Sequence, residues 1–206
     1  MLKTLLMIIG PTAVGKSDLA ILLAKKYNGE IISADSRQVY RGLDLGTGKV
    51  ARDEESKEEF LSEGVVHHMV DVVDAVEQYN ISDFQKQANK KLQEIWKKGK
   101  LPILCGGSPL YVVSVLEGWQ FPKTKPNIKL REELEKEKIE DLYKKLCQLD
   151  WKRAKTIDSK NKRRVVRALE IVLESKKIEP LEKKPLKAKI VVLGIKKDRE
   201  ELKKLI

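Results

Sequence analysis

One loop near the start of the chain has the composition of a phosphate-binding site. Residues 10–17 read Gly-Pro-Thr-Ala-Val-Gly-Lys-Ser, which fits the pattern G-x-x-x-x-G-K-[ST]. The glycines let the backbone curl until its N–H groups face phosphate oxygens, and the helix that follows adds its positive end. The lysine supplies a cation, and the serine hydroxyl can ligate Mg²⁺. We therefore predict that a pyrophosphate-type group, with Mg²⁺ on the serine, is held by Gly10, Pro11, Thr12, Ala13, Val14, Gly15, Lys16 and Ser17.

Asp35 is the second candidate for chemistry. A nucleotide hydrolase usually pairs a phosphate-binding loop with an acid at the end of another core strand, which holds the metal. The apolar run 101–105 ends instead in Gly-Gly-Ser, which argues against an ATPase. Asp35 follows the apolar run 30–34, so we expect it at the same sheet edge as the loop, where it can accept a proton. Residues 35–42 add two arginines and an amide, which suit reading a base and its phosphates.

A parallel sheet covered by helices would bring these residues together, and the chain alternates strand and helix patterns as such a sheet requires. The predicted strands span residues 4–9, 30–34, 65–70, 101–105 and 190–195. The predicted helices span residues 16–27, 53–62, 82–98, 108–117, 128–148, 151–157 and 161–175, with Ser82 as the N-cap of the third. We therefore predict an α/β fold of the P-loop NTPase-like class, with a doubly wound parallel sheet whose ligands bind beyond the carboxyl ends of the strands.

A change of character after Gly118 marks a second part of the chain. Pro122 and Pro126 bracket a Lys-rich loop, and the patterns that follow are helical. We expect a small helical insert at residues 121–157 and a catalytic core made of residues 1–120 and 158–206.

Composition limits the partners and the compartment. The 206 residues carry 42 Lys and Arg against 31 Asp and Glu, a net charge of +11 that favours polyanions such as nucleic acid. Two cysteines suggest a reducing compartment, so we expect a cytoplasmic protein. No apolar stretch approaches the roughly 20 residues needed to span a bilayer. We expect no membrane partner, and a monomer.

Five motifs in this order resemble the tRNA dimethylallyltransferase family, and together they cover essentially the whole chain. They are the loop at 10–17, Asp-Ser-Arg-Gln-Val-Tyr at 35–40 followed by Gly-Thr-Gly-Lys at 46–49, His-His-Met-Val-Asp at 67–71, Gly-Gly-Ser-Pro-Leu-Tyr at 106–111, and Arg-Arg-Val-Val-Arg-Ala-Leu-Glu at 163–170. The combination is far more specific than the phosphate-binding pattern alone.

The resemblance implies transfer of a dimethylallyl group from dimethylallyl diphosphate to the exocyclic amine of the adenosine that follows the anticodon in tRNA. The loop would cradle the diphosphate together with Mg²⁺, where charge builds on the leaving group. By the family's pattern Asp35 would accept the amine proton. Ser108 stands where family members usually carry Thr, and it would hydrogen-bond near the reacting centre.

The resemblance also implies which residues contact the anticodon stem-loop of tRNA. They are Asp35, Ser36, Arg37, Gln38, Lys129, Arg131, Arg163, Arg164, Val165, Val166 and Arg167. Arg163 and Arg167 share a helix face at i, i+4 spacing, which suits gripping a phosphate. The alternative interpretation of these arginines is an ordinary salt-bridged surface, for instance Arg167 with Glu170.

Two other functions fit the same residues. A nucleoside or small-metabolite kinase would bind ATP on the loop and an acceptor hydroxyl at Asp35. A non-catalytic tRNA-binding remnant is the other, because chains of the family continue beyond Ile206. The helical stripe that begins at Leu202 stops after about two turns, which is marginal for a helix by itself. We therefore expect a missing C-terminal part and an incomplete site.

Overall fold

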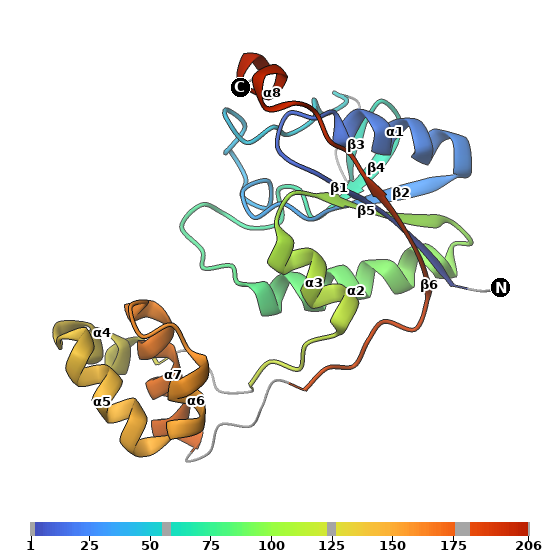
Figure 1. The fold of residues 1–206 in the computed structure, drawn as a ribbon. Coiled ribbons are helices and arrows are strands. Elements are labelled where there is room, and N and C mark those ends of the chain that lie inside the picture. The colour runs from blue at the N-terminus through green and yellow to red at the C-terminus, as the bar shows by residue number, and fades with distance from the viewer. Residues whose placement is uncertain (1–2, 55–58, 123–126, 176–181, 206) are drawn as a thin grey trace. The chain divides into compact units, whose positions relative to one another are not determined.

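The computed structural model describes residues 3–54, 59–122, 127–175 and 182–205. The chain forms two compact units, drawn in Figure 1. The first combines Met1–Trp119 with Lys184–Ile206 and is called the core unit below. The second, Gln120–Lys183, is called the helical unit.

The core unit is built on a six-stranded sheet with the strand order β3-β4-β2-β5-β1-β6. Its strands are β1 Thr4–Ile9, β2 Gly29–Ser33, β3 Phe60–Ser62, β4 Val65–His68, β5 Leu101–Gly106 and β6 Lys189–Gly194. All pairs are parallel except β3 with β4, which is antiparallel. The late strand β6, predicted at residues 190–195, returns to the sheet and pairs with β1. Because β5 lies between β1 and β2, the crossover through the first helix leaves a crevice at the carboxyl ends of these strands.

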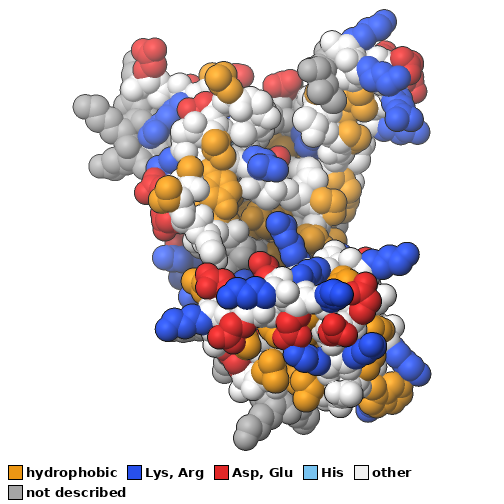
Figure 2. Space-filling model, turned by 90° about the vertical axis from the view of Figure 1, so that its left-hand side faces the viewer, with side chains coloured by type: hydrophobic (Ala, Val, Ile, Leu, Met, Phe, Trp, Pro, Cys, Tyr) orange, Lys and Arg blue, Asp and Glu red, His pale blue; other side chains and the backbone are white. Residues whose placement is uncertain are grey.

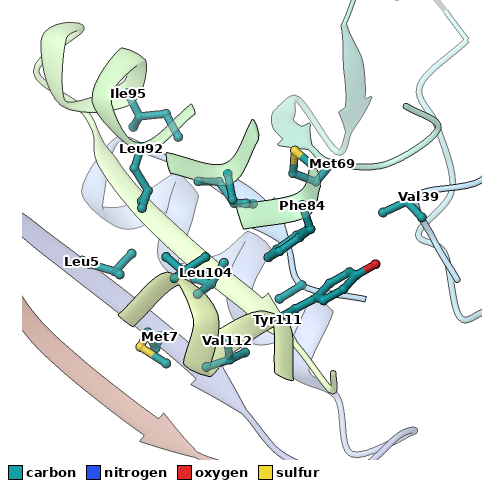
Figure 3. Packing of buried hydrophobic residues seen from close by; sticks show 14 of the residues in the cluster. Leu5, Met7, Val39, Met69, Phe84, Leu92, Ile95, Leu104, Tyr111 and Val112 are labelled. Atoms are coloured by element: carbon teal, nitrogen blue, oxygen red, sulfur yellow. The ribbon is translucent and has the colours of Figure 1, made fainter. Parts of the chain in front are cut away.

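Helices cover both faces of this sheet, because its buried strands are apolar on both sides. The helices of the core unit are α1 Lys16–Tyr27, α2 Ile81–Lys97, α3 Pro109–Glu117 and α8 Arg199–Leu205. Leu5 and Met7 of β1 pack with α2 and α3, whereas Leu6 and Ile8 pack with α1. Figure 3 shows the first of these clusters, where Phe84 and Leu92 of α2 lie against the sheet. The predicted α/β fold with a doubly wound, predominantly parallel sheet is confirmed.

The start of α2 differs from the prediction by two residues. The side chain of Asn80 accepts hydrogen bonds from the backbone N–H groups of Ser82 and Asp83. The carboxylate of Asp83 accepts in turn from the backbone N–H of Asn80. This reciprocal capping box makes Asn80 the N-cap and places Ser82 inside the helix, so the prediction of Ser82 as the cap was wrong.

The structure also contradicts the charged helix predicted at residues 53–62, because none of the described residues in this range is helical. Phe60–Ser62 forms the short edge strand β3, and residues 53–54 are not helical. Residues 55–58 lie outside the described part of the chain. Asp53 accepts hydrogen bonds from the backbone N–H groups of Glu63 and Gly64, which closes the hairpin between β3 and β4. The sequence pattern missed this because the strand is only three residues long.

The helical unit contains four helices around its own apolar core. They are α4 Ile128–Lys136, α5 Ile139–Leu149, α6 Trp151–Thr156 and α7 Lys162–Ser175. The core consists mainly of leucines and valines, among them Leu142, Leu146 and Leu169. Because α7 packs on α4 and α5, it belongs to this unit and not to the core, which corrects the expected domain boundaries.

Glu30 is a buried carboxylate of β2 held by three basic side chains. Its oxygens lie 2.7 Å from His68 Nε2, 3.1 Å from Lys98 Nζ and 2.9 Å from Lys100 Nζ. Burial acts to raise the pKa of Glu30, but hydrogen bonds from His68, Lys100 and Lys98 outweigh it and lower the pKa from 4.5 to about 2. The charged form of Glu30 is therefore the form that stabilises the fold.

We expect this cluster to make the core unit sensitive to acid. Because the pKa of Glu30 is lower in the folded state, its contribution is complete above about pH 4.5 and is lost as the pH falls toward about 2. The contribution is on the order of 2–3 kcal/mol. Urea unfolding of the wild type should show a loss of stability across this pH range, and the loss should be smaller in Glu30→Gln. Glu133→Gln is the control, because Glu133 is an exposed carboxylate of α4, and it should lose as much stability as the wild type. Equal acid sensitivity in the Glu30 variant would contradict the assignment.

Candidate active site

A cavity of about 490 Å³ opens in the core unit at the carboxyl ends of β1, β2 and β5. Seven of the residues predicted from sequence line it: Thr12, Ala13, Gly15, Lys16, Ser17, Asp35 and Gln38. The structure thus brings the phosphate-binding loop and the candidate proton acceptor into one cavity. Gly10, Pro11, Val14, Ser36, Arg37 and Ser108 are not among the lining residues.

The loop between β1 and α1 depends on its two glycines. Gly15 is the N-cap of α1 and has a φ of 90°, a left-handed conformation that favours glycine. A Cβ atom on Gly10 would lie 2.5 Å from the carbonyl oxygen of Ile195, which follows β6. Val14 is buried, so its side chain anchors the loop in the core and leaves its neighbours at the cavity. The Lys16 amine donates to the carbonyl of Pro11, which holds it over the loop.

Asp35 lies two residues after the end of β2, and bonds from Arg37 and Ser108 position it. Its Oδ1 atom accepts a hydrogen bond of 2.8 Å from the backbone N–H of Arg37. The hydroxyl of Ser108 accepts one of 3.0 Å from the backbone N–H of Ser36, and the Ser108 N–H donates to the carbonyl of Ala34. Ser108 is therefore bonded to both backbone neighbours of Asp35, although it does not line the cavity.

Gly106, at the end of β5, packs directly against the chain that carries Asp35. A Cβ atom at this position would lie 2.2 Å from the carbonyl oxygen of Ala34. We expect Gly106→Ala to displace Ala34 and Asp35 and to cost about 2–3 kcal/mol of unfolding free energy in urea titrations. Gly107→Ala is the matched control, because its Cβ would meet only ordinary contacts at 3.7 Å and 3.9 Å. Equal stability of the two variants would show that the close approach is not a constraint.

The cavity also contains residues to which the sequence analysis assigned no role. They are Asp18, Ala20, Ile31, Ser33, Thr47, Gly48, Lys49, Val50, His67, Cys105, Gly106, Gly107 and Lys197. Thr47, Gly48, Lys49 and His67 belong to motifs that carried the family resemblance, so the resemblance was the available signal. Lys197 follows β6, and the rule that ligands bind at the carboxyl ends of parallel strands would have pointed to it.

Two polar side chains deep in this cavity are uncharged at neutral pH. His67 is buried, with its Nδ1 atom 3.0 Å from the carbonyl oxygen of Val65. Burial is the main cause that lowers the pKa of His67, and it raises the pKa of the Cys105 thiol to about 12. The charge of the cavity therefore comes from its lysines and aspartates.

Glu170 organises the predicted tRNA-contacting residues of the helical unit. Its carboxylate is fully buried and accepts hydrogen bonds from Arg131 at 3.0 Å and 2.9 Å, from Arg167 at 2.5 Å and from the backbone N–H of Asn127 at 2.6 Å. Burial acts to raise the pKa of Glu170, but these donors outweigh it and lower the pKa. The salt bridge weighed as an alternative for Arg167 is thus present, and Arg131 shares it.

The other predicted contacts in the helical unit divide by exposure. Val165 and Val166 are buried in the core of the unit, so any contact of theirs with RNA would have to be made by the backbone. Lys129, Arg163 and Arg164 are exposed. On the face shown in Figure 2, the helical unit carries acidic side chains interspersed with basic ones. Any RNA contact on that face therefore depends on individual cations.

Residues 38–206 match the protein family described as IPP transferase. A tRNA dimethylallyltransferase of Bacillus cytotoxicus is 43% identical over 208 residues, which is 97% of this chain and 64% of that protein. The chain belongs to the IPP transferase family. Another relative in this family, a tRNA dimethylallyltransferase of Heliobacterium modesticaldum, is 41% identical over 170 residues, which is 81% of this chain and 51% of that protein.

Solved structures of IPP transferase family members share the fold. A eukaryotic dimethylallyltransferase, captured acting on tRNA, matches with a TM-score of 0.78 and 30% identity over 97% of this chain and 50% of its own. The tRNA isopentenylpyrophosphate transferase of Staphylococcus epidermidis matches with a TM-score of 0.56 and 35% identity over 97% of this chain and 65% of its own. The chain thus spans about half to two thirds of the relatives it matches. In the described part of the chain, no helix is both long and apolar enough to cross a membrane.

Proposed function

We propose that this chain contributes the donor site and the proton acceptor of a tRNA dimethylallyltransferase. The observation that carries the proposal is the single cavity that contains both the phosphate-binding loop and Asp35. Relatives in the family are named as transferases that act on tRNA, which favours prenyl transfer over the kinase alternative. The donor would be dimethylallyl diphosphate, and the acceptor would be the exocyclic amine of the adenosine 3′ of the anticodon.

The diphosphate would bind where the loop meets the start of α1. Backbone N–H groups at a helix N-terminus and the amine of Lys16 are suited to a leaving group that gains negative charge. Lys16 uses one N–H on the carbonyl of Pro11, which leaves two for phosphate oxygens. Lys197, which lines the same cavity from the segment after β6, adds a further positive charge.

Transfer then consists of one bond made and one broken. The adenosine nitrogen bonds to the first carbon of the dimethylallyl group, the bond between that carbon and oxygen breaks, and diphosphate leaves. The nitrogen loses a proton, which Asp35 accepts. Asp35 suits this role because Arg37 N–H binds its Oδ1 atom, and the bonds from Ser108 to the neighbouring backbone fix its position.

The donor set of the cavity fits Mg²⁺, which we propose as the cofactor. Mg²⁺ prefers oxygen ligands and is commonly held by one or two protein groups together with substrate phosphates. The Ser17 hydroxyl in the first turn of α1 would hold it beside the diphosphate. Bound there, the metal would neutralise charge on the leaving group.

The tRNA would be held by cations outside the cavity. Arg37 is exposed beside Asp35, and Lys129, Arg163 and Arg164 are exposed on the helical unit. Contacts of this kind neutralise phosphates, so binding should weaken steeply with salt.

A transfer assay tests this function. The chain, supplied with the C-terminal segment of a longer relative, is incubated with Mg²⁺, dimethylallyl diphosphate labelled in the allyl group, and an anticodon stem-loop RNA that carries an unmodified adenosine after the anticodon. We expect label in that adenosine and release of diphosphate. Transfer of phosphate from ATP to a nucleoside without prenyl transfer would establish the kinase instead, and salt-sensitive RNA binding with no transfer would establish a binding remnant.

A further inference from the structure

Lys49 lines the cavity, but its ammonium group is already fully bonded within the protein. The Nζ atom lies 2.6 Å from Asp71 Oδ1, 2.9 Å from Asp44 Oδ1 and 2.7 Å from the carbonyl oxygen of Tyr40. An ammonium has three N–H donors, so these acceptors use all of them. Only 4% of the Lys49 side chain is exposed. Lys49 therefore differs from the other lysines of the cavity, because the amine of Lys16 donates to a single backbone carbonyl, that of Pro11, and Lys197 is exposed.

The ammonium stays charged in this position. Burial acts to lower the pKa of Lys49, but the hydrogen bonds to Asp71 and Asp44 outweigh it, and the pKa is raised. The group facing it most closely, Asp71, is about one quarter exposed, whereas Asp44 is largely in solvent. The pair of Lys49 with Asp71 is thus the sheltered part of the cluster.

Gln38 holds the same segment from the other side. Its amide nitrogen donates to the carbonyl oxygens of Thr47 and Gly48, and its amide oxygen accepts from the hydroxyl of Ser33. The side chain is thereby bonded through both ends of its amide. The contact of Gln38 with tRNA stays a prediction; in the structure its amide bonds the backbone of the cavity wall.

Apolar packing contributes little to holding this segment in place. Leu45 is 97% exposed and Leu43 is also exposed, so residues 43–49 are anchored chiefly by polar bonds. Asp71 is in turn tied to the segment after β2, because its backbone N–H donates to the carbonyl of Gln38. Asp71 adopts a φ of 53°, an uncommon conformation for this residue that the turn after β4 imposes.

We propose that Lys49 is a positioning residue that fixes residues 43–49 as the acceptor-side wall of the cavity, and that it does not bind the diphosphate. The proposal rests on the proposed function for the identity of the acceptor. The acceptor side is assigned because this segment is bonded to the chain that follows Asp35: Gln38 donates to the carbonyls of residues 47 and 48, and Lys49 donates to the carbonyl of Tyr40. Among the cations of the cavity, this leaves Lys16 and Lys197 to bind the donor.

The first test measures local order and needs no catalysis. Hydrogen exchange of the backbone amides of residues 43–49 is compared in the wild type, Lys49→Met and Asp71→Asn. We expect exchange to accelerate about 10-fold or more in both variants, with no change at residues 10–17. Lys25→Met is the matched control, because it removes an exposed lysine that is paired with Glu63. Unchanged exchange at residues 43–49 in Lys49→Met would overturn the proposal.

The second test separates positioning from direct binding of phosphate. Affinities for inorganic diphosphate with Mg²⁺ and for the anticodon stem-loop RNA are measured by calorimetry. We expect Lys49→Met to leave diphosphate affinity within about 3-fold and to weaken RNA affinity about 10-fold, in the range seen when a supporting residue is lost. A loss of diphosphate affinity in Lys49→Met as large as in Lys16→Met would identify Lys49 as a phosphate ligand and overturn the proposal.

The double variant Lys49→Met with Asp71→Asn completes a double-mutant cycle, which measures whether the two side chains act together. If the two residues act as one anchor, the double variant should be no worse than either single variant in exchange and in RNA affinity. Additive effects would show that they act separately. A wild-type chain that transfers no prenyl group would refute the proposed function, while exchange and diphosphate affinity would still decide the role of Lys49.

Discussion

Asp35→Asn is expected to lower the rate of prenyl transfer by about 100- to 10,000-fold, the range attributed to a positioned general base. Asparagine keeps the shape of the side chain and can still accept the hydrogen bond from the N–H of Arg37. It cannot take a proton from the adenosine amine, so the nitrogen would keep its proton as the new bond forms. The loss should therefore appear in the rate of transfer and not in substrate binding.

Single-turnover assays with saturating RNA and donor measure this rate directly. Affinities for stem-loop RNA and for diphosphate should remain within about 3-fold of the wild type, because the proposed role of Asp35 is to accept a proton in the transfer step and not to bind either substrate. Asp74→Asn is the control, since Asp74 pairs with Arg41 on the surface and does not line the cavity. A rate close to that of the wild type in Asp35→Asn would remove Asp35 from the proposed role.

Lys16→Met is expected to abolish binding of the donor, with affinity for diphosphate reduced about 100-fold or more. The amine is one of the charged donors at the phosphate-binding loop, and hydrogen bonds from charged donors to phosphate contribute about 1.5–3 kcal/mol each. Methionine keeps a stem of similar length and removes the ammonium group, with its charge and its N–H donors. Calorimetric titration with inorganic diphosphate and Mg²⁺ measures the change.

The affinity of Lys16→Met for RNA provides the internal comparison. Lys16 lies at the loop, so stem-loop RNA should bind this variant as well as it binds the wild type. Lys3→Met serves as a control for the loss of one positive charge, because Lys3 contacts Gln93 and Trp96 away from the cavity. If Lys16→Met lowered the affinity for RNA and left the affinity for diphosphate unchanged, the loop would bind RNA and not the diphosphate of the donor.

The sequence predicted most of the core unit because burial leaves a strong pattern there. The runs at β1 and β5 are apolar on both faces, which only a sheet covered by helices explains, and the loop at Gly10–Ser17 joins a strand to a helix as its mechanism requires. The prediction of secondary structure failed where the local sequence pattern and the tertiary contacts favour different elements. The sequence 53–62 is rich in charged residues typical of helices, yet its last residues pair with β4 because tertiary contacts override a weak propensity.

The helical unit was harder to delimit for a related reason. Helix α7 has an amphipathic pattern that fits packing on a sheet or on other helices equally well, and the pattern does not name its partner. In the structure, the ion pair between buried Glu170 of α7 and Arg131 of α4 shows that α7 packs in the helical unit. A glutamate among apolar residues could have been noted as a charge that needs a partner.

The candidate site was predicted in part. Asp35 and the loop could be placed at one sheet edge, because the carboxyl ends of parallel strands lie together. The bonds that Gln38 and Lys49 make could not be predicted, since they depend on a loop whose path no periodicity specifies. Motif membership therefore identified residues of the site without separating those that meet a ligand from those that hold the wall.

Binding of an unreactive donor analogue distinguishes a site for an allylic diphosphate from a site for ATP. The chain is titrated with the thiodiphosphate analogue of dimethylallyl diphosphate in Mg²⁺, and in parallel with ATP. We expect the analogue to bind at least about 10-fold more tightly than ATP, roughly 1.4 kcal/mol, and Lys16→Met to abolish its binding while Lys49→Met does not. Binding of ATP without binding of the analogue would contradict this expectation.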